Sequence, residues 1–399
     1  MDFSFSEEEL MFKNSVREFA EKEIMPHAKK IDREKRIPKE LVKKLADFGI
    51  LGMTFPEEYG GQNSGFFLAT LAIQELARAE LSMSLPVLTL VTNSWGFIFG
   101  RYGTEEAKEE FLPKVTKGEA IVGIASTEPH GGSDVAGIKT RMEKKNGKWV
   151  INGEKVFISG VREAKEIGGG HVTLVKTDPE KGHRGISLVF VPMNLEGIAT
   201  TIYDDLGRDG LSTGGIIYSD VEVPDHYIIG ELNKGFYLAM EGFNDARILV
   251  AAATIGAAER ALEMGMEWIK ERKLFGYPIA KFEGIQFELV EDWIKLENAK
   301  HLVYKAAWLI DKYYRGEKVF RSDINKYVAA AKYYAPTVSF EIIKHVMMWH
   351  GALAYTREME LEMALRGVFS YVIGAEGAMN VMKIIIGREL LGREFMPYK

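Results

Sequence analysis

A carboxylate near the C-terminal end of the chain has only small neighbours. Glu376 lies in the segment Gly374–Ala378, whose other residues are all glycine or alanine. Small side chains leave room for a ligand to approach the carboxylate, and apolar surroundings would raise its pKa until it could act as a base near neutral pH. An ordinary solvated glutamate of a helix is the alternative, because strongly perturbed carboxylates are rare.

A second cluster of polar residues fills the nine positions Ser126–Asp134. It combines glycines and an acid with the hydroxyls of Ser126, Thr127 and Ser133, directly after a short apolar stretch. Glycine lets a backbone approach a ligand closely, and hydroxyls and free amides can hydrogen-bond to a flavin ring or a pyrophosphate. A tight turn with capping hydroxyls would have the same composition. The cluster therefore indicates either a ligand site or a turn.

Arg272 is a candidate for binding a phosphate. It stands at the expected end of a long helix, shortly before the turn residues Gly276-Tyr277-Pro278. Its planar guanidinium could hold a phosphate, or it could satisfy the last helix carbonyls and the macrodipole. The neighbouring residues do not decide between the two roles.

Composition and missing motifs exclude several classes of protein. A net charge of -6 argues against a general nucleic-acid binder. Cysteine is absent, which excludes disulfides, thiolate metal sites and cysteine nucleophiles, and there is no His-Glu-x-x-His pair, so we predict no metal centre. The phosphate loop of nucleotide hydrolases, the Gly-x-Ser-x-Gly elbow and the Gly-x-Gly-x-x-Gly turn are also missing, which disfavours a Rossmann dehydrogenase.

Length and residue pattern suggest a cytoplasmic protein of several domains. The 399 residues are too many for one ordinary core, so two or three domains are expected. The N-terminal residues lack the features of a secretory signal, and no apolar run reaches the roughly 20 residues that span a bilayer. Cysteine is absent and there are only three glutamines, a pattern that fits a thermophilic source.

Hydrophobic periodicity divides the chain into a helical part, a β part and a second helical part. Residues 1–120 are predicted to be helical. Short β-branched runs over 121–225, with an Asn146-Gly147 hairpin turn, predict an antiparallel sheet or barrel. Helical periodicity returns over 226–399 and suits a bundle. The expected bundle helices are 233–272, 282–315, 322–349 and 357–391.

Together these segments resemble the acyl-CoA dehydrogenase flavoprotein family. Ser126–Asp134 is similar to the family's Thr-Glu-Pro-x-x-Gly-Ser-Asp signature, and Ile151–Ser159 is similar to its Asn-Gly-x-Lys-x-Trp-Ile-Thr strand. Arg272–Ile279 matches its Arg-x-x-Phe-Gly-x-x-Ile element, and Phe243–Arg247 resembles the start of its C-terminal bundle. The resemblance covers essentially the whole chain. It implies an α+β fold with an N-terminal helical domain, a middle antiparallel β-barrel domain and a C-terminal four-helix bundle.

The resemblance also implies FAD as cofactor, bound between the middle and C-terminal domains of a homotetramer that is a dimer of dimers. Arg272 and Phe275 would reach the FAD of a neighbouring subunit, and the segment around Gly351 would meet its adenylate end. The CoA portion would contact Asn244 and Arg247. The implied cofactor-binding residues are Ser126, Thr127, Ser133, Phe157, Ser159, Arg272, Phe275 and Gly351, and Ser133 would also lie near the entering pantetheine.

Counting back from Ile385–Glu389 aligns Glu376 with the family's catalytic base. Some members carry their base near Phe243 instead, but the corresponding residue here is Ala246, which cannot take a proton. The resemblance then implies that Glu376 removes the α-proton of an acyl-CoA thioester while the β-hydrogen leaves as hydride to flavin N5, giving the trans-2-enoyl-CoA. An electron-transfer flavoprotein normally reoxidises the reduced FAD.

The sequence departs from the family pattern at several positions, which leaves alternatives open. Ala375–Ala378 replaces the usual Tyr-Glu-Gly-Thr, Phe157 replaces a tryptophan, and Gly351 and Tyr355 alone remain of the Gln-x-x-Gly-Gly-x-Gly-Tyr segment. A related flavoprotein with different chemistry, such as an oxidase or a decarboxylating dehydrogenase, is one alternative. An inactive flavin-binding scaffold is another.

The acyl group is the part of the substrate about which the sequence says least. Bulky side chains lie where the family's acyl cavity ends, which suggests a short or branched acyl group. Core packing is an equal explanation for apolar residues on one helix. The residues concerned are Leu88, Val91 and Trp95.

Overall fold

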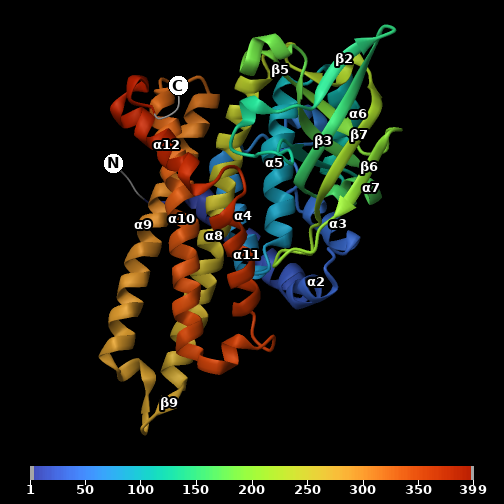
Figure 1. Cartoon of the computed structure of the whole chain (residues 1–399). Coiled ribbons are helices and arrows are strands. Elements are labelled where there is room, and N and C mark those ends of the chain that lie inside the picture. The colour runs from blue at the N-terminus through green and yellow to red at the C-terminus, as the bar shows by residue number, and fades with distance from the viewer. Residues whose placement is uncertain (1–3, 397–399) are drawn as a thin grey trace.

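Helices form the first part of the molecule in the computed structural model, which describes residues 4–396 (Figure 1). Ser6 caps the first of them, because its hydroxyl accepts from the Glu9 N–H and the Glu9 carboxylate accepts from the Ser6 N–H. The N-terminal helices are α1 (Glu7–Phe19), α2 (Ala28–Glu34), α3 (Lys39–Asp47), α4 (Gly65–Ala79), α5 (Ser84–Tyr102) and α6 (Glu105–Thr116). The long buried helix α5 contacts both the sheet and the C-terminal bundle, so it connects the three parts of the fold.

A mixed sheet of eight strands follows, in the order β6-β7-β3-β2-β4-β5-β8 with β1 beside β4. The predicted hairpin at Asn146-Gly147 is confirmed, since these residues join β2 to β3 with φ angles of 51° and 84°. Most pairs are antiparallel as predicted, but β1 and β2 both run parallel to β4. The strands are β1 (Ile121–Ala125), β2 (Arg141–Lys145), β3 (Lys148–Ser159), β4 (Gly169–Lys176), β5 (Ile186–Pro192), β6 (Ile198–Ile202), β7 (Thr213–Val223) and β8 (Ile228–Ile229), with the short helix α7 (Val161–Glu166) between β3 and β4.

Long helices form the last part of the chain. They are α8 (Gly235–Glu271), α9 (Glu283–Tyr314), α10 (Arg321–His350), α11 (Leu361–Ile373) and α12 (Met379–Leu391), with the small hairpin β9 (Lys273–Leu274) and β10 (Tyr277–Pro278) after α8. In Figure 1 this hairpin lies at the end of the bundle away from the sheet. A methyl group on Gly256 would come within 2.1 Å of the Gln74 carbonyl oxygen, so glycine allows α8 and α4 to pack closely.

One predicted helix of the bundle is interrupted. Residues 357–391 were expected to form one helical segment, whereas α11 ends at Ile373 and α12 begins at Met379. The break coincides with Gly374–Ala378, where three consecutive residues have positive φ angles: 53° for Ala375, 55° for Glu376 and 117° for Gly377. The hydrophobic periodicity resumes on the other side, which is why the sequence suggests continuity.

Neither a membrane-spanning helix nor a metal-binding cluster is found within residues 4–396. Within residues 4–396 no helix combines the length and apolar character required to cross a membrane. In the same part of the chain, no group of three or more histidine, aspartate or glutamate side chains is arranged to hold a metal ion.

Candidate active site

Glu376 lies in the loop Gly374–Ala378, which joins α11 to α12. Ala375 and Glu376 both adopt the left-handed backbone region. This conformation costs a residue with a side chain about 1–2 kcal/mol, so it persists only where the surroundings fix it. The loop therefore needs strong contacts to hold the carboxylate in place.

Two buried cations of the bundle supply these contacts. Arg247 of α8 donates from Nε to the Glu376 carbonyl oxygen at 2.8 Å, and from Nη1 to Asn244 Oδ1 at 3.0 Å. Lys332 of α10 donates to the carbonyl oxygens of Gly374 and Gly377, at 2.9 and 2.8 Å. The loop is thus held by hydrogen bonds from two neighbouring helices.

The electrostatic surroundings of Glu376 suit a general base. Burial raises the pKa of Glu376 to about 7, against the opposing influence of Arg247, the Trp95 indole and Lys332. The buried Trp95 Nε1–H makes no hydrogen bond of normal geometry within residues 4–396, but it lies near enough to the Glu376 carboxylate to favour its charged form. A carboxylate with a pKa near neutrality can both accept and release a proton at physiological pH.

Arg247 is a buried residue beside Glu376 and Asn244. Its side chain is only 6% exposed, and its guanidinium is hydrogen-bonded to Glu376 and Asn244. Asn244 is half-buried and also donates to Asn325 Oδ1 at 3.2 Å. The predicted neighbours Arg247 and Asn244 are therefore hydrogen-bonded to each other beside Glu376, and their contact with CoA stays a prediction.

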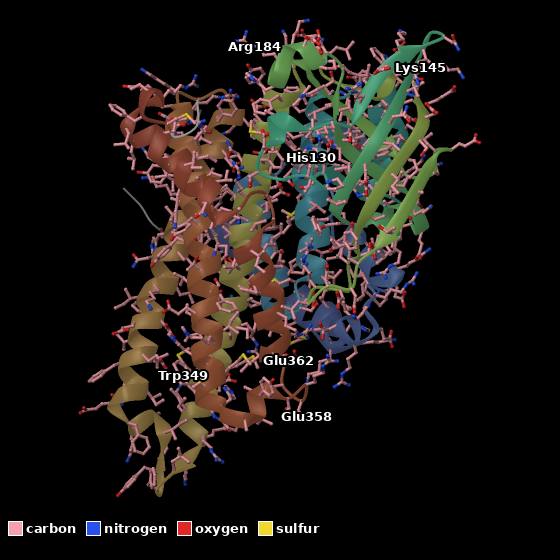
Figure 2. All side chains as sticks on the ribbon, viewed as in Figure 1. His130, Lys145, Arg184, Trp349, Glu358 and Glu362 are labelled. Carbon is pink, nitrogen blue, oxygen red and sulfur yellow. The ribbon has the colours of Figure 1, made fainter. Side chains whose placement is uncertain are left out.

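The motif Ser126–Asp134 forms a loop that is anchored by a buried ion pair. Lys155 of β3 donates to Glu128 Oε1 at 2.8 Å and to the Ser126 carbonyl oxygen at 3.1 Å. The Val156 N–H donates to the Thr127 carbonyl oxygen at 2.9 Å. Figure 2 shows His130, in the same loop, on the side of the sheet nearest the C-terminal helices. The loop is thus fixed at the edge of the sheet that faces the bundle.

The hydroxyls of this loop are available to a ligand. In the described part of the chain, the side chains of Ser126, Thr127 and Ser133 make no hydrogen bond to another residue. Ser126 and Thr127 are half-buried, whereas Ser133 is exposed. These hydroxyls, two half-buried and one exposed, lie beside a glycine-rich backbone. They can hydrogen-bond to the polar edge of a ring and to a pyrophosphate. The residues present therefore fit the flavin cofactor that the sequence motifs imply.

Phe157 and Ser159, on the next strand, differ in their availability. Phe157 has a positive φ of 58° and a side chain that is 68% exposed, with its ring centroid 5.4 Å from that of Tyr203. Ser159 Oγ accepts a hydrogen bond from Arg208 Nη1 at 3.2 Å. An exposed aromatic ring held in a strained conformation is suited to stack on a flat ligand.

Three predicted cofactor residues lie apart from this group. Arg272 directly precedes the small hairpin after α8, and Phe275 lies in the turn of this hairpin, where it is 91% exposed. Gly351 ends α10 with φ 66° and ψ -147°, a conformation that requires glycine. Figure 2 labels Trp349, two residues earlier, far along the bundle from His130. A single chain therefore does not bring all the predicted cofactor residues together.

Sequence reasoning missed Arg208 and Lys332, which shape the site, and it named Trp95 only as a bulky residue at the end of the acyl cavity. The signal for Lys332 was present, because it occupies the buried face of a helix at helical spacing from Val328 and Pro336. A lysine at such a position is uncommon unless it has partners. The partners themselves could not be inferred, since they are carbonyl groups of a loop that the periodicity concealed.

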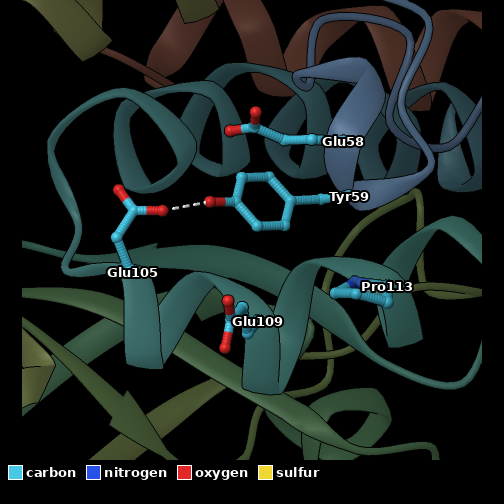
Figure 3. A pocket seen from close by; sticks show the side chains of 5 residues that line it. All are labelled: Glu58, Tyr59, Glu105, Glu109 and Pro113. Carbon is cyan, nitrogen blue, oxygen red and sulfur yellow. Dashed lines mark hydrogen bonds between the residues drawn. The ribbon is translucent and has the colours of Figure 1, made fainter.

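The surface hollow of about 340 Å³ drawn in Figure 3 is separate from these residues. It is lined by Glu58, Tyr59, Glu105, Glu109 and Pro113, and the Tyr59 hydroxyl donates to Glu105 at 2.5 Å. None of the predicted site residues lines it. Its walls carry mainly acidic side chains, and we assign it no role.

Comparisons with known proteins match the whole length of the described fold. Three family models match: Acyl-CoA dehydrogenase, N-terminal domain, over residues 6–119, the middle domain over 123–221 and the C-terminal domain over 233–391. A probable acyl-CoA dehydrogenase of Bacillus subtilis (strain 168) is 33% identical over 98% of this chain and 100% of its own length. Acryloyl-CoA reductase (NADH) of Anaerotignum propionicum is 34% identical, over 98% of this chain and 97% of its own.

A solved structure agrees with these matches. Butyryl-CoA dehydrogenase from Megasphaera elsdenii superposes with a TM-score of 0.89 at 30% sequence identity, covering 98% of this chain and 100% of that one. The similarity therefore extends over all three parts of the fold, including the loop that carries Glu376.

Proposed function

Because the chain belongs to the acyl-CoA dehydrogenase family of oxidoreductases, we propose that it converts an acyl-CoA thioester to the trans-2-enoyl-CoA with FAD as cofactor. The observation that carries this proposal is Glu376, a carboxylate with a pKa raised to about 7 in a loop held by two helices. A base of this strength suits the removal of a weakly acidic α-proton.

Glu376 serves the reaction with both its side chain and its backbone. The carboxylate accepts the α-proton. Within the described residues the Glu376 N–H donates to no other group of the chain, so it is free to donate to the thioester carbonyl oxygen. Such a donor stabilises the negative charge that develops on this oxygen as the proton leaves. FAD, when bound, supplies the acceptor for the β-hydrogen as hydride.

The proposed cofactor site has two parts. Ser126, Thr127 and Ser133 would hold the cofactor from the motif loop, together with Phe157 and Ser159 of β3. The second part consists of Arg272, Phe275 and Gly351 of a neighbouring subunit. This arrangement is supported by the separation of the two groups in one chain and by the free hydroxyls of the motif loop.

A second copy of the chain is the proposed partner that completes the site. Large apolar side chains are exposed along the outer surface of α9 and its preceding turn, which is typical of a surface that is covered in an assembly. They include Phe282, Phe287, Val290, Trp293 and Ile294. We propose a homotetramer built as a dimer of dimers. Within each chain, the proposed domain boundaries lie at about residues 120 and 225.

The substrate and electron partners follow the same proposal. Ser133, Asn244 and Arg247 are the proposed contacts of the CoA portion, and Arg247 also holds the loop of Glu376. An electron-transfer flavoprotein is the proposed acceptor of electrons. A cytoplasmic location and a thermophilic source stay predictions.

The visible spectrum of the purified protein tests this function. We expect a yellow protein whose flavin absorbance bleaches when a suitable acyl-CoA is added without oxygen, from a set of short, branched and long acyl groups. Rapid return of the colour in air would favour an oxidase instead. A flavin spectrum that no acyl-CoA bleaches would support an inactive scaffold, and a colourless protein that cannot be reconstituted with FAD would contradict the proposal.

The rate of the reaction should depend on pH through Glu376. Because burial raises its pKa to about 7, the carboxyl group keeps its proton below this pH and cannot act as a base. We expect kcat/KM to fall by about tenfold per pH unit well below pH 7 and to reach a plateau above it. The groups that face the carboxylate are Trp95 of α5, Arg247 of α8, Lys332 of α10 and Tyr371 of α11.

A pH profile of kcat/KM measured with a fixed acyl-CoA provides the check. A profile that stays flat down to pH 5 would mean that the base has an ordinary carboxylate pKa or that another group takes the proton.

A further inference from the structure

Lys332 is a completely buried lysine whose ammonium group donates to three backbone carbonyls. It lies on α10 with 0% of its surface exposed, and in the described part of the chain no carboxylate lies within ion-pairing distance of it. Its Nζ donates to the carbonyl oxygens of Tyr371, Gly374 and Gly377, at 3.1, 2.9 and 2.8 Å. One ammonium group therefore uses its three donors on one short stretch of chain.

The three carbonyls lie on both sides of Glu376. Tyr371 belongs to the last turn of α11, where carbonyl groups have no partner within the helix. Gly374 is the residue directly after this helix, and Gly377 follows Glu376. A cation at the C-terminal end of a helix also interacts favourably with the helix dipole. Lys332 thus connects the end of α11 to the far side of the loop.

The geometry of these bonds determines the path of the chain between them. Ala375 and Glu376 have left-handed φ angles of 53° and 55°, which neither residue favours by itself. Arg247 reaches the loop from the other side through the Glu376 carbonyl oxygen. With both flanking carbonyls tied to Lys332, the backbone can only turn sharply between them, and this turn sets the direction of the Glu376 side chain.

We propose that Lys332 is a positioning residue for proton abstraction, which fixes the strained loop so that the carboxylate and backbone N–H of Glu376 face the substrate. This inference rests on the proposed function of Glu376 as the base. Lys332 is buried and contacts neither substrate nor cofactor. It affects the chemical step through the backbone of the loop that carries Glu376.

The burial of a charged group at this position supports the assignment. Burial is the main cause that lowers the pKa of Lys332, to about 8; the positive charge of Arg247 lowers it further, and the negative charge of Glu376 opposes both. A hydrophobic residue of similar size would avoid this unfavourable desolvation if packing were the only requirement. The presence of an ammonium group here is explained by the three carbonyl groups, because an apolar side chain would leave them without hydrogen-bond partners.

Two substitutions separate the hydrogen bonds from the volume of the side chain. Lys332→Met keeps the length but removes all three donors, whereas Lys332→Arg keeps the charge and the capacity to donate. If Lys332→Met does not fold, Lys332→Gln is the second variant: its amide removes the charge and keeps only two donors on a shorter side chain, so an intermediate effect is expected. Val346→Ala is the matched control, because Val346 is a fully buried residue of the same helix that lies 14 positions further along the chain.

Two readouts are required for each variant. The first is hydrogen–deuterium exchange of the peptide that covers residues 371–381, which reports on the loop without depending on activity. The second is kcat and KM with the acyl-CoA that bleaches the wild-type flavin. For Lys332→Met we expect faster exchange in this peptide and a kcat lower by roughly 100-fold with a KM nearly unchanged, since a small misplacement of a reacting group has this effect. Lys332→Arg should recover most of both, and Val346→Ala should change neither.

The possible outcomes are distinct. Wild-type exchange of the loop in Lys332→Met would overturn the inference, and so would a loosened loop with an unchanged kcat. Retention of turnover in Glu376→Gln would instead contradict the proposed function, whatever the exchange shows. Faster exchange together with a lower kcat, both reversed by arginine, would support the positioning role and would not follow from a general loss of stability.

Discussion

Replacing Glu376 with glutamine is expected to reduce kcat with a good acyl-CoA substrate by about 10³- to 10⁴-fold, near the full contribution of a general base. Glutamine has nearly the same shape and can keep the loop conformation, but its amide cannot accept the α-proton. The backbone contacts of the residue use its carbonyl oxygen and leave its N–H free, and neither depends on the side chain.

The measurement is single-turnover bleaching of the flavin, which follows the chemical step directly. Binding of the acyl-CoA should persist in Glu376→Gln, because the CoA portion and the backbone donors are untouched. Glu358→Gln is the matched control, since Glu358 is an exposed glutamate before α11. If Glu376→Gln bleaches at the wild-type rate, the base must be another residue, and the assignment of the loop as the catalytic element is wrong.

The fold could be predicted largely from local sequence signals. Asn146-Gly147 predicted a hairpin because its two positive φ angles are a local property of those residues. The change from helical to β periodicity near residue 120 likewise corresponds to the step from α6 to β1. The parallel pairing of β1 with β4 could not be predicted in this way, because it joins strands that are separated by the motif loop and a hairpin.

The residue types of the candidate site could be predicted from the sequence, but the contacts that hold its loop in place could not. The segment around Glu376 was identified by small residues and by resemblance, whereas its left-handed turn depends on Lys332 and Arg247 from two other helices. Positive φ angles at an alanine and a glutamate contradict local preference, so tertiary contacts must impose them. No local pattern reveals such contacts, and a break in a helix is correspondingly easy to miss.

Loss of the buried ion pair in the motif loop should have the largest effect on stability. Lys155 and Glu128 are both buried, with 2.8 Å between Nζ and Oε1. Lys155→Met leaves the Glu128 carboxylate buried without its cation, which is expected to lower the free energy of unfolding by about 3–5 kcal/mol. Denaturant titration of the two proteins measures this difference.

Two further variants show whether the lost stability comes from the unpaired charge of Glu128 or from replacing any lysine of this strand. Lys148→Met changes a lysine of the same strand that pairs with Glu222 at the surface, and a loss of at most about 1 kcal/mol is expected for such an exposed pair. Glu128→Gln combined with Lys155→Met removes both charges and should recover part of the lost stability. Equal stability of Lys155→Met and the wild type would show that the pair contributes nothing.

The loss of stability in Lys155→Met should depend on pH through the pKa of Glu128. Burial tends to raise this pKa, but Lys155 and the bonds from Lys139 and Thr140 bring it below its ordinary value. A lowered pKa in the folded protein gives stability that is present above the ordinary carboxylate pKa and is lost as the pH falls through the folded value. The deficit of Lys155→Met should therefore be largest near neutral pH and shrink in acid, where the carboxyl is neutral.

Lys155 has a second function besides its ion pair with Glu128, and retention of the cofactor distinguishes the two. Its ammonium also donates to the Ser126 carbonyl oxygen, so it fixes the residue that we propose to face the flavin. Removing the charge of Glu128 can restore stability to the double variant but cannot replace this bond. We therefore expect Lys155→Met and the double variant to lose FAD to a similar extent on gel filtration, measured by flavin absorbance per protein. If the double variant kept its FAD at the wild-type level, the lysine would act only through the charge of Glu128, and the position of Ser126 would not depend on it.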